Sequence, residues 1–324
     1  MNKTIINYGI IGAGHIGKYH INQIKRINDV KLIGIYDINF EYAAKVAQEK
    51  NTTAFNNINE LLNQCDAVTI ATPASTHFQL SKLVIESKLH LFIEKPFVTT
   101  VEEAQQLIAL SKQYNVKLQI GHIERFNPVF TYLLQESSTI NPKFIESHRL
   151  TPFNIRGTDI DVILDLMIHD LDLILCLMQD SVKNIHATGV NILTDSLDLV
   201  NARLEFEKGC VANITASRIS NKQMRKMRIF EPTKYTSLDF QNNTIDQYEI
   251  TSNTNNQSAN DLFTLKDRAV SHNSIAIPQT NALYEELVSF IMSILHSKDI
   301  QVSGDAGKKA IELAIAIRKQ IDNK

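Results

Sequence analysis

Residues 12–17 read Gly-Ala-Gly-His-Ile-Gly, directly after the apolar run Ile5–Ile11 and at the start of an amphipathic segment. This spacing predicts a turn from a strand into a helix whose first backbone N–H groups bind a pyrophosphate. Gly12 permits the tight turn, Gly14 lets the backbone approach the phosphates, and Gly17 lets helix and strand pack closely. The stretch therefore predicts a dinucleotide-binding Rossmann domain, with a chance cluster of turn glycines as the alternative.

Asp37 follows the second predicted strand, Val30–Tyr36, about twenty residues after the glycines. A carboxylate at this place accepts hydrogen bonds from the ribose hydroxyls of adenosine and repels a 2′-phosphate. We therefore expect NAD as the cofactor. NADP is the alternative, because the preference depends on Asp37 alone.

Short β-branched runs and longer amphipathic segments alternate from Ile5 to His122. This alternation is typical of βαβ units and predicts a parallel sheet. One of the helices starts near Thr99 and has Glu102 and Glu103 in its first turn, where the helix dipole favours acids. The other strands expected in this sheet are Ala67–Ala71, His90–Ile93 and Lys117–Ile120.

Beyond Arg125 the chain has strand-like runs that are typical of an antiparallel sheet, with a helix over 162–178 against one face. We expect a long loop over 251–274, which is rich in Asn, Ser and Thr, and two closing helices near 282–295 and 305–321. The expected strands are Phe144–Leu150, Ile185–Ile192, Val200–Phe206, Val211–Ser217 and Met227–Phe230.

The predicted fold class is an α/β Rossmann domain plus a C-terminal α+β domain with an open, mainly antiparallel sheet. The Rossmann domain is expected to occupy residues 1–122 and the second domain residues 123–324. The closing helices are able to pack back on the first domain.

The composition fits this picture, because 324 residues are enough for two domains, and 44% hydrophobic and 21% charged residues are near the average for soluble globular proteins. A formal net charge of −2 gives no overall attraction to nucleic acid or to an anionic membrane. Cys65, Cys176 and Cys210 lack metal-binding or redox spacing, which suits reduced thiols. With no secretory signal and no membrane-length apolar run, we expect a cytoplasmic protein without nucleic-acid or membrane partners.

Polar motifs follow two of the predicted parallel strands, at the carboxyl ends where such sheets bind ligands. Residues 71–73 read Ala-Thr-Pro, followed by His77, and residues 94–96 read Glu-Lys-Pro. With the glycine stretch, these motifs resemble the Gfo/Idh/MocA family, whose hallmark is Glu-Lys-Pro after the fifth strand of a Rossmann domain. The resemblance covers essentially the whole chain and implies an NAD(P)-dependent dehydrogenase that acts on CH–OH groups.

The resemblance also implies roles for single residues. Lys95 inherits contact with the nicotinamide ribose and the substrate, in a turn where a cis Lys95–Pro96 bond is an option. His77 matches a family histidine, and we expect it to brace the following helix rather than perform chemistry. Ala74 stands where family members often have Asn, which puts the polar contact made there in question. The residues expected to bind the cofactor are Gly12, Ala13, Gly14, His15, Ile16, Gly17, Asp37, Thr72, Pro73, His77, Glu94 and Lys95.

Polar residues also interrupt the apolar run 164–173. Asp165, His169 and Asp172 recur at i, i+4 and i+7, and hence on one face of a helix, where a carboxylate can orient an imidazole. The family has the same Asp-x-x-x-His pair, in which the histidine is the acid–base residue. A satisfied structural network and a metal site are the alternatives, and we expect no metal because no further ligand cluster has zinc-like spacing.

The expected reaction is reversible hydride transfer between a secondary alcohol carbon and the nicotinamide ring. His169 would take the hydroxyl proton, Asp165 would hold the histidine tautomer, and Lys95 would stabilise the developing alkoxide. These three residues are the expected catalytic set.

Three further stretches, 121–128, 151–159 and 217–228, resemble the branch of the family that contains UDP-N-acetylglucosamine 3-dehydrogenase. The resemblance implies a nucleotide-sugar substrate whose 3-keto product an aminotransferase converts to a diamino sugar for lipid A. Arg149, Arg218 and Arg228 add to the cations available for a diphosphate. The residues expected to bind the substrate are Lys95, Arg125, Asn127, Arg156, Asp165 and His169.

Two other functions stay open. One is a free-sugar or inositol dehydrogenase of the same family, and the other is an NAD(P)-binding sensor or scaffold without catalysis, which the presence of Lys95 and His169 disfavours. In either case the open sheet has a face that needs cover, so we expect a homodimer or homotetramer built through it.

Overall fold

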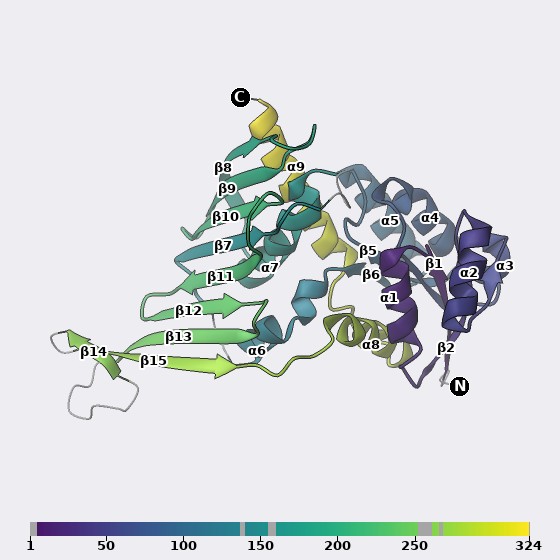
Figure 1. Cartoon of the computed structure of the whole chain (residues 1–324), viewed down its shortest axis with the longest axis horizontal. Helices are drawn as coiled ribbons and strands as arrows, with labels where there is room; N and C mark the ends of the chain where they lie inside the picture. Colours follow the sequence, from purple (N-terminus) through teal and green to yellow (C-terminus); the bar gives the residue numbers. More distant parts are fainter. Residues whose placement is uncertain (1–4, 137–139, 155–159, 252–260, 266–267, 324) are drawn as a thin grey trace. The chain divides into compact units, whose positions relative to one another are not determined.

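The computed structural model describes residues 5–136, 140–154, 160–251, 261–265 and 268–323 (Figure 1). The chain divides into two compact units. Unit 1 comprises residues 1–126 and 281–312, and unit 2 comprises residues 127–280 and 313–324. Each unit has its own sheet, and the two sheets confirm the predicted fold class of a Rossmann domain and an α+β domain with a mainly antiparallel sheet.

Unit 1 alternates strands and helices along the chain, and its six strands are all parallel in the order β3-β2-β1-β4-β5-β6. This doubly wound order is that of the Rossmann fold. The strands are β1 Ile6–Ile11, β2 Val30–Tyr36, β3 Ala54–Phe55, β4 Ala67–Ile70, β5 His90–Glu94 and β6 Leu118–Gly121. The helices are α1 His15–Ile24, α2 Phe40–Lys50, α3 Ile58–Leu62, α4 Ala74–Glu86, α5 Val101–Gln113, a 3₁₀ turn Ile123–Phe126, α8 Ala282–Leu295 and the first part of α9 Gly304–Asp322.

Aromatic rings fill the centre of unit 1. Phe92 of β5 lies edge-on to Phe290 of α8 with 5.9 Å between ring centroids, and Tyr8 of β1 meets the same ring at 6.4 Å. All three side chains are fully buried, so they contribute large apolar areas to the core of this unit. At the start of α5, Thr100 and Glu103 form a capping box, in which each side chain accepts a hydrogen bond from the other's backbone N–H.

The register of the parallel strands places their carboxyl ends along one edge of the sheet. Ile11 pairs with both Tyr36 and Ile70, and Glu94 pairs with Gly121. The turns that follow β1, β2, β4 and β5 therefore share this edge, where ligands bind in open α/β sheets. These are the turns that contain the glycine stretch and the other predicted cofactor-binding motifs of unit 1.

Unit 2 contains a nine-stranded sheet in its described residues, in the order β14-β15-β13-β12-β11-β7-β10-β9-β8. β7 and β10 pair in parallel, and the other neighbours pair antiparallel. The strands are β7 Phe144–Leu150, β8 Val182–Val190, β9 Leu199–Phe206, β10 Val211–Ser217, β11 Met224–Phe230, β12 Lys234–Asp239, β13 Thr244–Thr251, β14 Asp261–Leu265 and β15 Arg268–Ala276. The helical segments are α6 Pro128–Glu136, a π-helical turn Ile163–Met167, α7 Ile168–Met178 and the end of α9.

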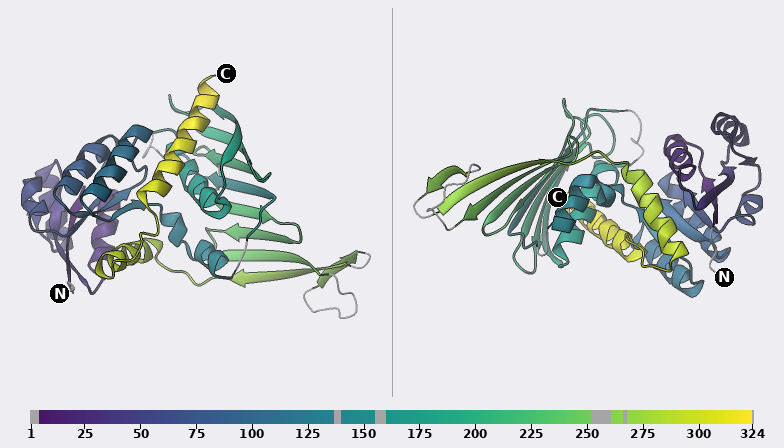
Figure 2. Two further views of the ribbon diagram at one scale, coloured as in Figure 1. Left: turned by 180° about the vertical axis from the view of Figure 1, so that it is seen from behind. Right: turned by 90° about the horizontal axis from the view of Figure 1, so that it is seen from below.

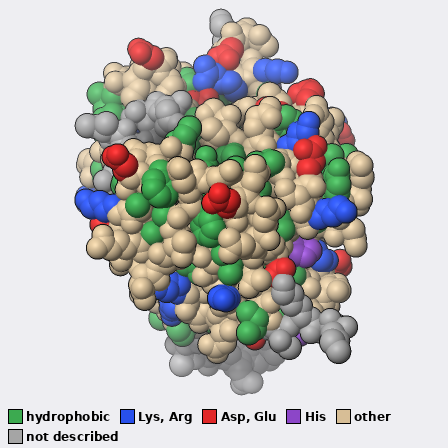
Figure 3. All heavy atoms as spheres, turned by 90° about the vertical axis from the view of Figure 1, so that its right-hand side faces the viewer, with side chains coloured by type: hydrophobic (Ala, Val, Ile, Leu, Met, Phe, Trp, Pro, Cys, Tyr) green, Lys and Arg blue, Asp and Glu red, His purple; other side chains and the backbone are tan. Residues whose placement is uncertain are grey.

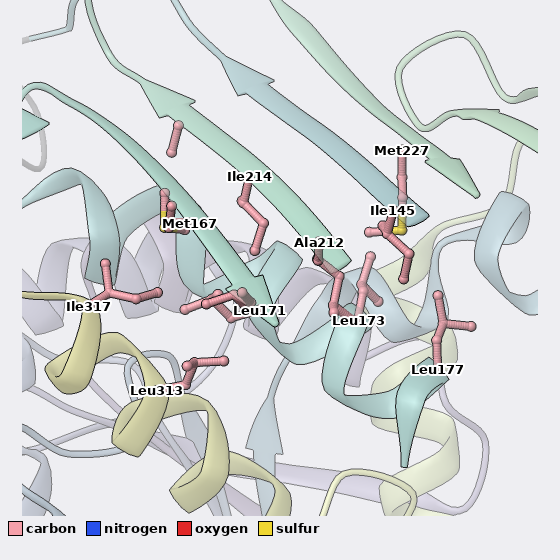
Figure 4. Packing of buried hydrophobic residues seen from close by; sticks show 14 of the residues in the cluster. Ile145, Met167, Leu171, Leu173, Leu177, Ala212, Ile214, Met227, Leu313 and Ile317 are labelled. Atoms are coloured by element: carbon pink, nitrogen blue, oxygen red, sulfur yellow. The ribbon is translucent and has the colours of Figure 1, made fainter. Parts of the chain in front are cut away.

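Helices of unit 2 lie on one face of its sheet, and in the described part of the unit the opposite face carries no helix (Figure 2). The covered face holds the hydrophobic core (Figure 4). Leu171 and Leu173 of α7 pack there with Ile214 of β10, and α9 adds Leu313 and Ile317. The sheet is therefore a single layer with one face left open, as predicted.

The prediction of a loop over 251–274 is wrong for the part of that segment that the structure describes. β14 and most of β15 lie within it, and β15 pairs with β13 from Thr251↔Ala269 to Thr244↔Ala276. Within 268–276 only Ala269 is buried, so β15 has no alternation of buried apolar residues to reveal it. Residues 252–260 and 266–267 lie outside the described part of the chain.

The surface shown in Figure 3 carries basic and acidic side chains interspersed, without a large patch of one sign. This agrees with the formal net charge of −2. None of the helices among the described residues has the length and apolar character needed to cross a membrane.

Candidate functional site

The glycine turn of unit 1 uses each of its glycines for a different reason. Gly12 has a φ of +100°, and a Cβ on it would lie 2.4 Å from the carbonyl oxygen of Ala71. A Cβ on Gly17 would lie 1.9 Å from the carbonyl oxygen of Gly12. Gly12 and Gly17 therefore cannot carry a side chain without displacing the turn between β1 and α1.

Gly14 differs, because a Cβ built on it meets nothing within 4 Å. It is the N-cap of α1, no side chain caps the helix there, and no acid occupies its first turn. The backbone at Gly14 is thus open to the approach of a ligand, at the end of α1 where the helix dipole is positive. This turn fits a pyrophosphate group.

Asp37 ties the end of β2 to the glycine turn. Its Oδ2 accepts a hydrogen bond from the Ala13 N–H at 2.8 Å, and its Oδ1 accepts one from the Asn39 N–H at 3.0 Å. Ile38, the next residue, is 94% exposed. A carboxylate followed by an uncovered apolar side chain fits a ribose and an adenine ring, and the sequence analysis did not single out Ile38, although a large apolar residue beside the acid was a readable signal.

The turns after β4 and β5 are joined by a buried histidine. His77, on α4, is 1% exposed, and its two ring nitrogens lie 2.8 Å from the Pro96 carbonyl oxygen and 2.9 Å from the Thr72 carbonyl oxygen. The Lys95–Pro96 peptide is cis. His77 therefore holds the two motifs together through backbone groups, and its ring faces no solvent.

Glu94 and Lys95 occupy the end of β5. The Glu94 side chain is 19% exposed, and its Oε1 lies 2.7 Å from Nε2 of His20, on α1. Burial alone would raise the pKa of Glu94, but the hydrogen bond and the charge of His20, together with the charge of Lys95, lower it below the usual value. The sequence analysis missed His20, whose signal is a polar residue on the apolar face of the cofactor helix.

In unit 2, Asp165 and His169 belong to two different kinds of helical turn. The helix predicted over 162–178 starts as the π-helical turn Ile163–Met167, which includes Asp165, and His169 lies in the first turn of α7. Asp161 begins this segment, because its Oδ1 accepts hydrogen bonds from the N–H groups of Ile163 and Leu164. The regular i, i+4, i+7 face expected from the sequence is thus interrupted by a π turn, a feature often found at functional sites.

The residue next to His169 anchors α7 to the sheet. Asp170 is 2% exposed and accepts hydrogen bonds from Nε of Arg149 at 2.7 Å and from the Ser147 hydroxyl at 2.9 Å, both on β7. These bonds hold the Asp170 carboxylate against β7. They therefore fix the backbone of the first turn of α7, which includes His169. Sequence analysis did not assign this role to Asp170.

The predicted cationic residues differ in their surroundings. Arg149 is buried against Asp170, and Arg218 is buried with its guanidinium 4.0 Å from Asp198. Arg228 pairs with Glu146 at 2.9 Å on the open face of the sheet. Arg156 lies outside the described residues.

Arg125 and Asn127 occupy the chain segment where unit 1 passes into unit 2. Arg125 is half-buried in the 3₁₀ turn, and Asn127 caps α6 by accepting a hydrogen bond from the Val129 N–H at 3.0 Å. Lys95 lies in unit 1, while Asp165 and His169 lie in unit 2. Among the described residues, no group of three or more His, Cys, Asp or Glu side chains is placed to hold a metal ion.

Comparison with known proteins adds the following. A family model described as "Oxidoreductase family, NAD-binding Rossmann fold" matches residues 6–122, and one described as "GFO/IDH/MocA C-terminal domain" matches residues 143–231. UDP-N-acetylglucosamine 3-dehydrogenase of Acidithiobacillus ferrooxidans is 37% identical over 314 residues, which cover 97% of this chain and 96% of that protein. A solved structure of it matches with a TM-score of 0.89 and covers 98% of each chain. Myo-inositol 2-dehydrogenase of Thermotoga maritima is 26% identical, with 98% of this chain and 96% of that protein covered.

Proposed function

This chain belongs to the Gfo/Idh/MocA family of NAD(P)-dependent oxidoreductases that act on CH–OH groups, and we propose that it oxidises UDP-N-acetylglucosamine at C3. The observation that carries the substrate is the 37% identity over 97% of the chain to an enzyme of that specificity. Residues of both units support the chemistry.

The residues of unit 1 fit a nicotinamide dinucleotide. The pyrophosphate would bind the amides at Gly14, and the adenosine ribose would bind Asp37. Of the remaining predicted contacts, His15 and Ile16 begin α1, and Thr72 and Pro73 lie between β4 and α4. When bound, NAD supplies the acceptor for a hydride from the substrate carbon. The Asp37 charge favours NAD over NADP.

The proton of the substrate hydroxyl is assigned to His169. A neutral imidazole near the reacting hydroxyl removes this proton as the carbon loses hydride, and Asp165 positions the ring and stabilises its charged form. The Lys95 ammonium stabilises the negative charge that develops on the substrate oxygen. Arg125, Asn127 and Arg156 are proposed contacts of the nucleotide sugar, and the first two lie where the chain leaves the cofactor-binding unit.

The variant His169→Ala tests the assignment of the base. We expect kcat to fall by about 10²- to 10⁴-fold, since general-base catalysis contributes on this order. The dissociation constant for NAD, measured by titration calorimetry, should stay unchanged, because His169 lies outside unit 1. Near-normal turnover in His169→Ala would remove this residue from the base role.

A free-sugar or inositol dehydrogenase is the second candidate, and the full-length match to a myo-inositol 2-dehydrogenase favours it. Inhibition by UDP separates the two, because a nucleotide-sugar site binds UDP competitively with its substrate and a free-sugar site has no group that recognises it. An NAD-binding sensor without catalysis would reduce no cofactor with any member of a panel of sugars, inositols and nucleotide sugars.

We also propose that the open face of the unit 2 sheet pairs with a second copy of the chain. A ladder of rings crosses five strands on this face, with centroid distances of 4.4 to 5.7 Å. These half-buried rings form an aromatic strip, and aromatic residues are enriched in the surfaces that symmetric dimers bury. The ladder consists of Phe144, Phe230, Tyr235, Tyr248 and His272.

A further inference from the structure

His20 is a buried polar residue on the helix that starts at the glycine turn. It follows Gly17 on α1, has no accessible surface, and packs edge-on against Phe92 of β5 with 5.3 Å between ring centroids. An imidazole in such apolar surroundings needs a hydrogen-bond partner, because an unpaired buried polar group is destabilising. Its partner is Glu94, whose Oε1 lies 2.7 Å from Nε2.

Glu94 is confined from several sides. Its Oε2 accepts a hydrogen bond from the Lys95 backbone N–H at 3.3 Å. From β6, Gly121 lies so close that a Cβ on it would stand 3.1 Å from Oε2. The position of the carboxylate is therefore restricted by α1, by β6 and by the turn that contains Lys95.

The direction of the hydrogen bond follows from the charge of Glu94. Burial opposes ionisation, but the hydrogen bond from His20, the charges of His20 and Lys95, and the Lys95 N–H lower the pKa of Glu94 below its usual value. An ionised carboxylate only accepts, so Nε2 of His20 carries the proton. Nδ1 of His20 has no hydrogen-bond partner among the described residues.

We propose that His20 is a positioning residue for the reaction: its Nε2–H donates to Glu94 and so fixes the Glu94-Lys95-Pro96 turn to the helix whose first amides bind the cofactor. The proposal rests on the proposed function, because it assigns Lys95 to the developing alkoxide. The bond joins α1 to the end of β5, next to Lys95. A movement of α1 is therefore coupled to a movement of Lys95. Preorganisation of this kind matters, since small misplacements of a catalytic group greatly lower its rate.

His77 supports the same turn from its other side, where a ring nitrogen binds the Pro96 carbonyl oxygen. The two histidines act on different atoms. His77 holds backbone, whereas His20 sets the position and charge of the Glu94 carboxylate. Loss of His20 should therefore change the titration of Glu94, whereas loss of a residue that only packs should not.

The test compares His20→Leu, which removes the donor at similar volume, with His20→Gln, whose amide N–H can still reach Glu94. We expect kcat of His20→Leu to fall by about 10- to 100-fold with the dissociation constant for NAD changed less than about twofold. His20→Gln should recover most of kcat. His90→Leu is the matched control, because His90 lies at the opposite end of β5 and accepts a hydrogen bond from the Lys117 N–H.

The second readout is the titration of Glu94, followed by NMR of its labelled carboxyl carbon. The groups around this carboxylate are His20 from α1, Lys95 from its own turn, and the segment after β6, which contains the buried His122 and Glu124. Without His20, burial dominates, so the pKa of Glu94 should rise in His20→Leu and give the kcat profile a new ionisation on its acid side. His90→Leu should show neither change, and the rise in His20→Gln should be smaller than in His20→Leu, because Gln keeps the hydrogen bond but not the charge of His20.

Several outcomes would overturn the proposal. One is a folded His20→Leu with wild-type kcat and an unchanged Glu94 titration, and another is a loss of kcat that His20→Gln reproduces in full. If His20→Leu does not fold, the imidazole nitrogen shifts of the wild-type protein decide, because an unprotonated Nε2 contradicts the proposed bond. If the wild type oxidises no sugar or nucleotide sugar, the proposed function fails, and the Glu94 titration alone then decides whether His20 holds the turn.

Discussion

Asp37 accepts hydrogen bonds from the Ala13 and Asn39 backbone, so a negative charge stands at the junction of the glycine turn and the end of β2. An Asn at this position keeps an oxygen for the Ala13 N–H but loses the charge that repels a 2′-phosphate. We expect the kcat/KM ratio of NAD over NADP to fall by about tenfold or more in Asp37→Asn, as for the loss of one repulsive contact.

Steady-state kinetics with both cofactors measures this ratio. Asp66→Asn is the control, because Asp66 also accepts a backbone hydrogen bond, from the Asn7 N–H, but lies before β4 at the other edge of the sheet. An unchanged ratio in Asp37→Asn would mean that another group selects the cofactor.

Asp198 makes a similar backbone contact in unit 2, and its stability contribution depends on pH. Burial would raise its pKa, but hydrogen bonds from the N–H groups of Ile192, Thr194 and Leu193 and from the Thr194 hydroxyl lower it from 3.8 to about 2. A group whose pKa is lowered by folding stabilises the protein above its unfolded pKa and loses this effect as the pH falls through the folded pKa.

We therefore expect Asp198→Asn to lower the free energy of unfolding by about 1 to 2 kcal/mol between pH 5 and 8, about what the pKa shift corresponds to. The difference from wild type should shrink below about pH 4. Urea titrations at a series of pH values measure it. A difference that stays constant into the acid range would contradict the linkage.

The sequence predicted single residues whose role depends on their neighbours in the chain. It did not predict pairs of residues that are far apart in the sequence. The glycines and Asp37 were readable because their spacing is set by one strand–turn–helix unit. The pairs His20–Glu94 and Arg149–Asp170 form only when the helices dock on their sheets. No local pattern tells which acid meets which base.

Among the elements, α7 depends on a buried ion pair beneath its first turn. Asp170→Asn would remove the carboxylate that pairs with the buried Arg149 guanidinium, and breaking a buried ion pair destabilises proteins by about 3 kcal/mol or more. Urea unfolding should show this loss. The double variant Arg149→Met with Asp170→Leu should be more stable than Asp170→Asn, since it buries no charge, and a double variant that is less stable would contradict the electrostatic account.

Elements with a buried face were predicted well, and those without one were not. β2, β7 and β10 have the predicted bounds, and each places an isoleucine in a hydrophobic core, namely Ile35, Ile145 and Ile214. β12, β13 and β15 were missed because their sequences are mostly polar, and their buried hydrophobic residues are only Leu238, Ile245 and Ala269 among the described side chains. The π turn before α7 was also missed, because periodicity alone does not distinguish it from an α-helix.

For the whole molecule, the ring ladder on the open face predicts a homodimer or homotetramer. Light scattering at micromolar concentration should give a mass above that of the 36.6 kDa chain. Tyr235→Glu, at the centre of the ladder, should shift the mass towards the monomer because it places a charge in an apolar contact. Tyr114→Glu, at the end of α5, is the control. A monomeric wild type would contradict the proposed interface.

Unit 1 contains the residues proposed to bind NAD, and unit 2 contains the residues proposed to move the substrate proton, so turnover is the direct test of both. The measurement is nicotinamide absorbance with purified protein, NAD and UDP-N-acetylglucosamine, with glutamate and a partner aminotransferase to remove the keto product. The account predicts steady growth of the reduced-cofactor signal, absent in His169→Ala. No signal with this substrate, but growth with free sugars or inositols, would contradict the nucleotide-sugar assignment, and no signal with any of them would contradict the proposed catalysis itself.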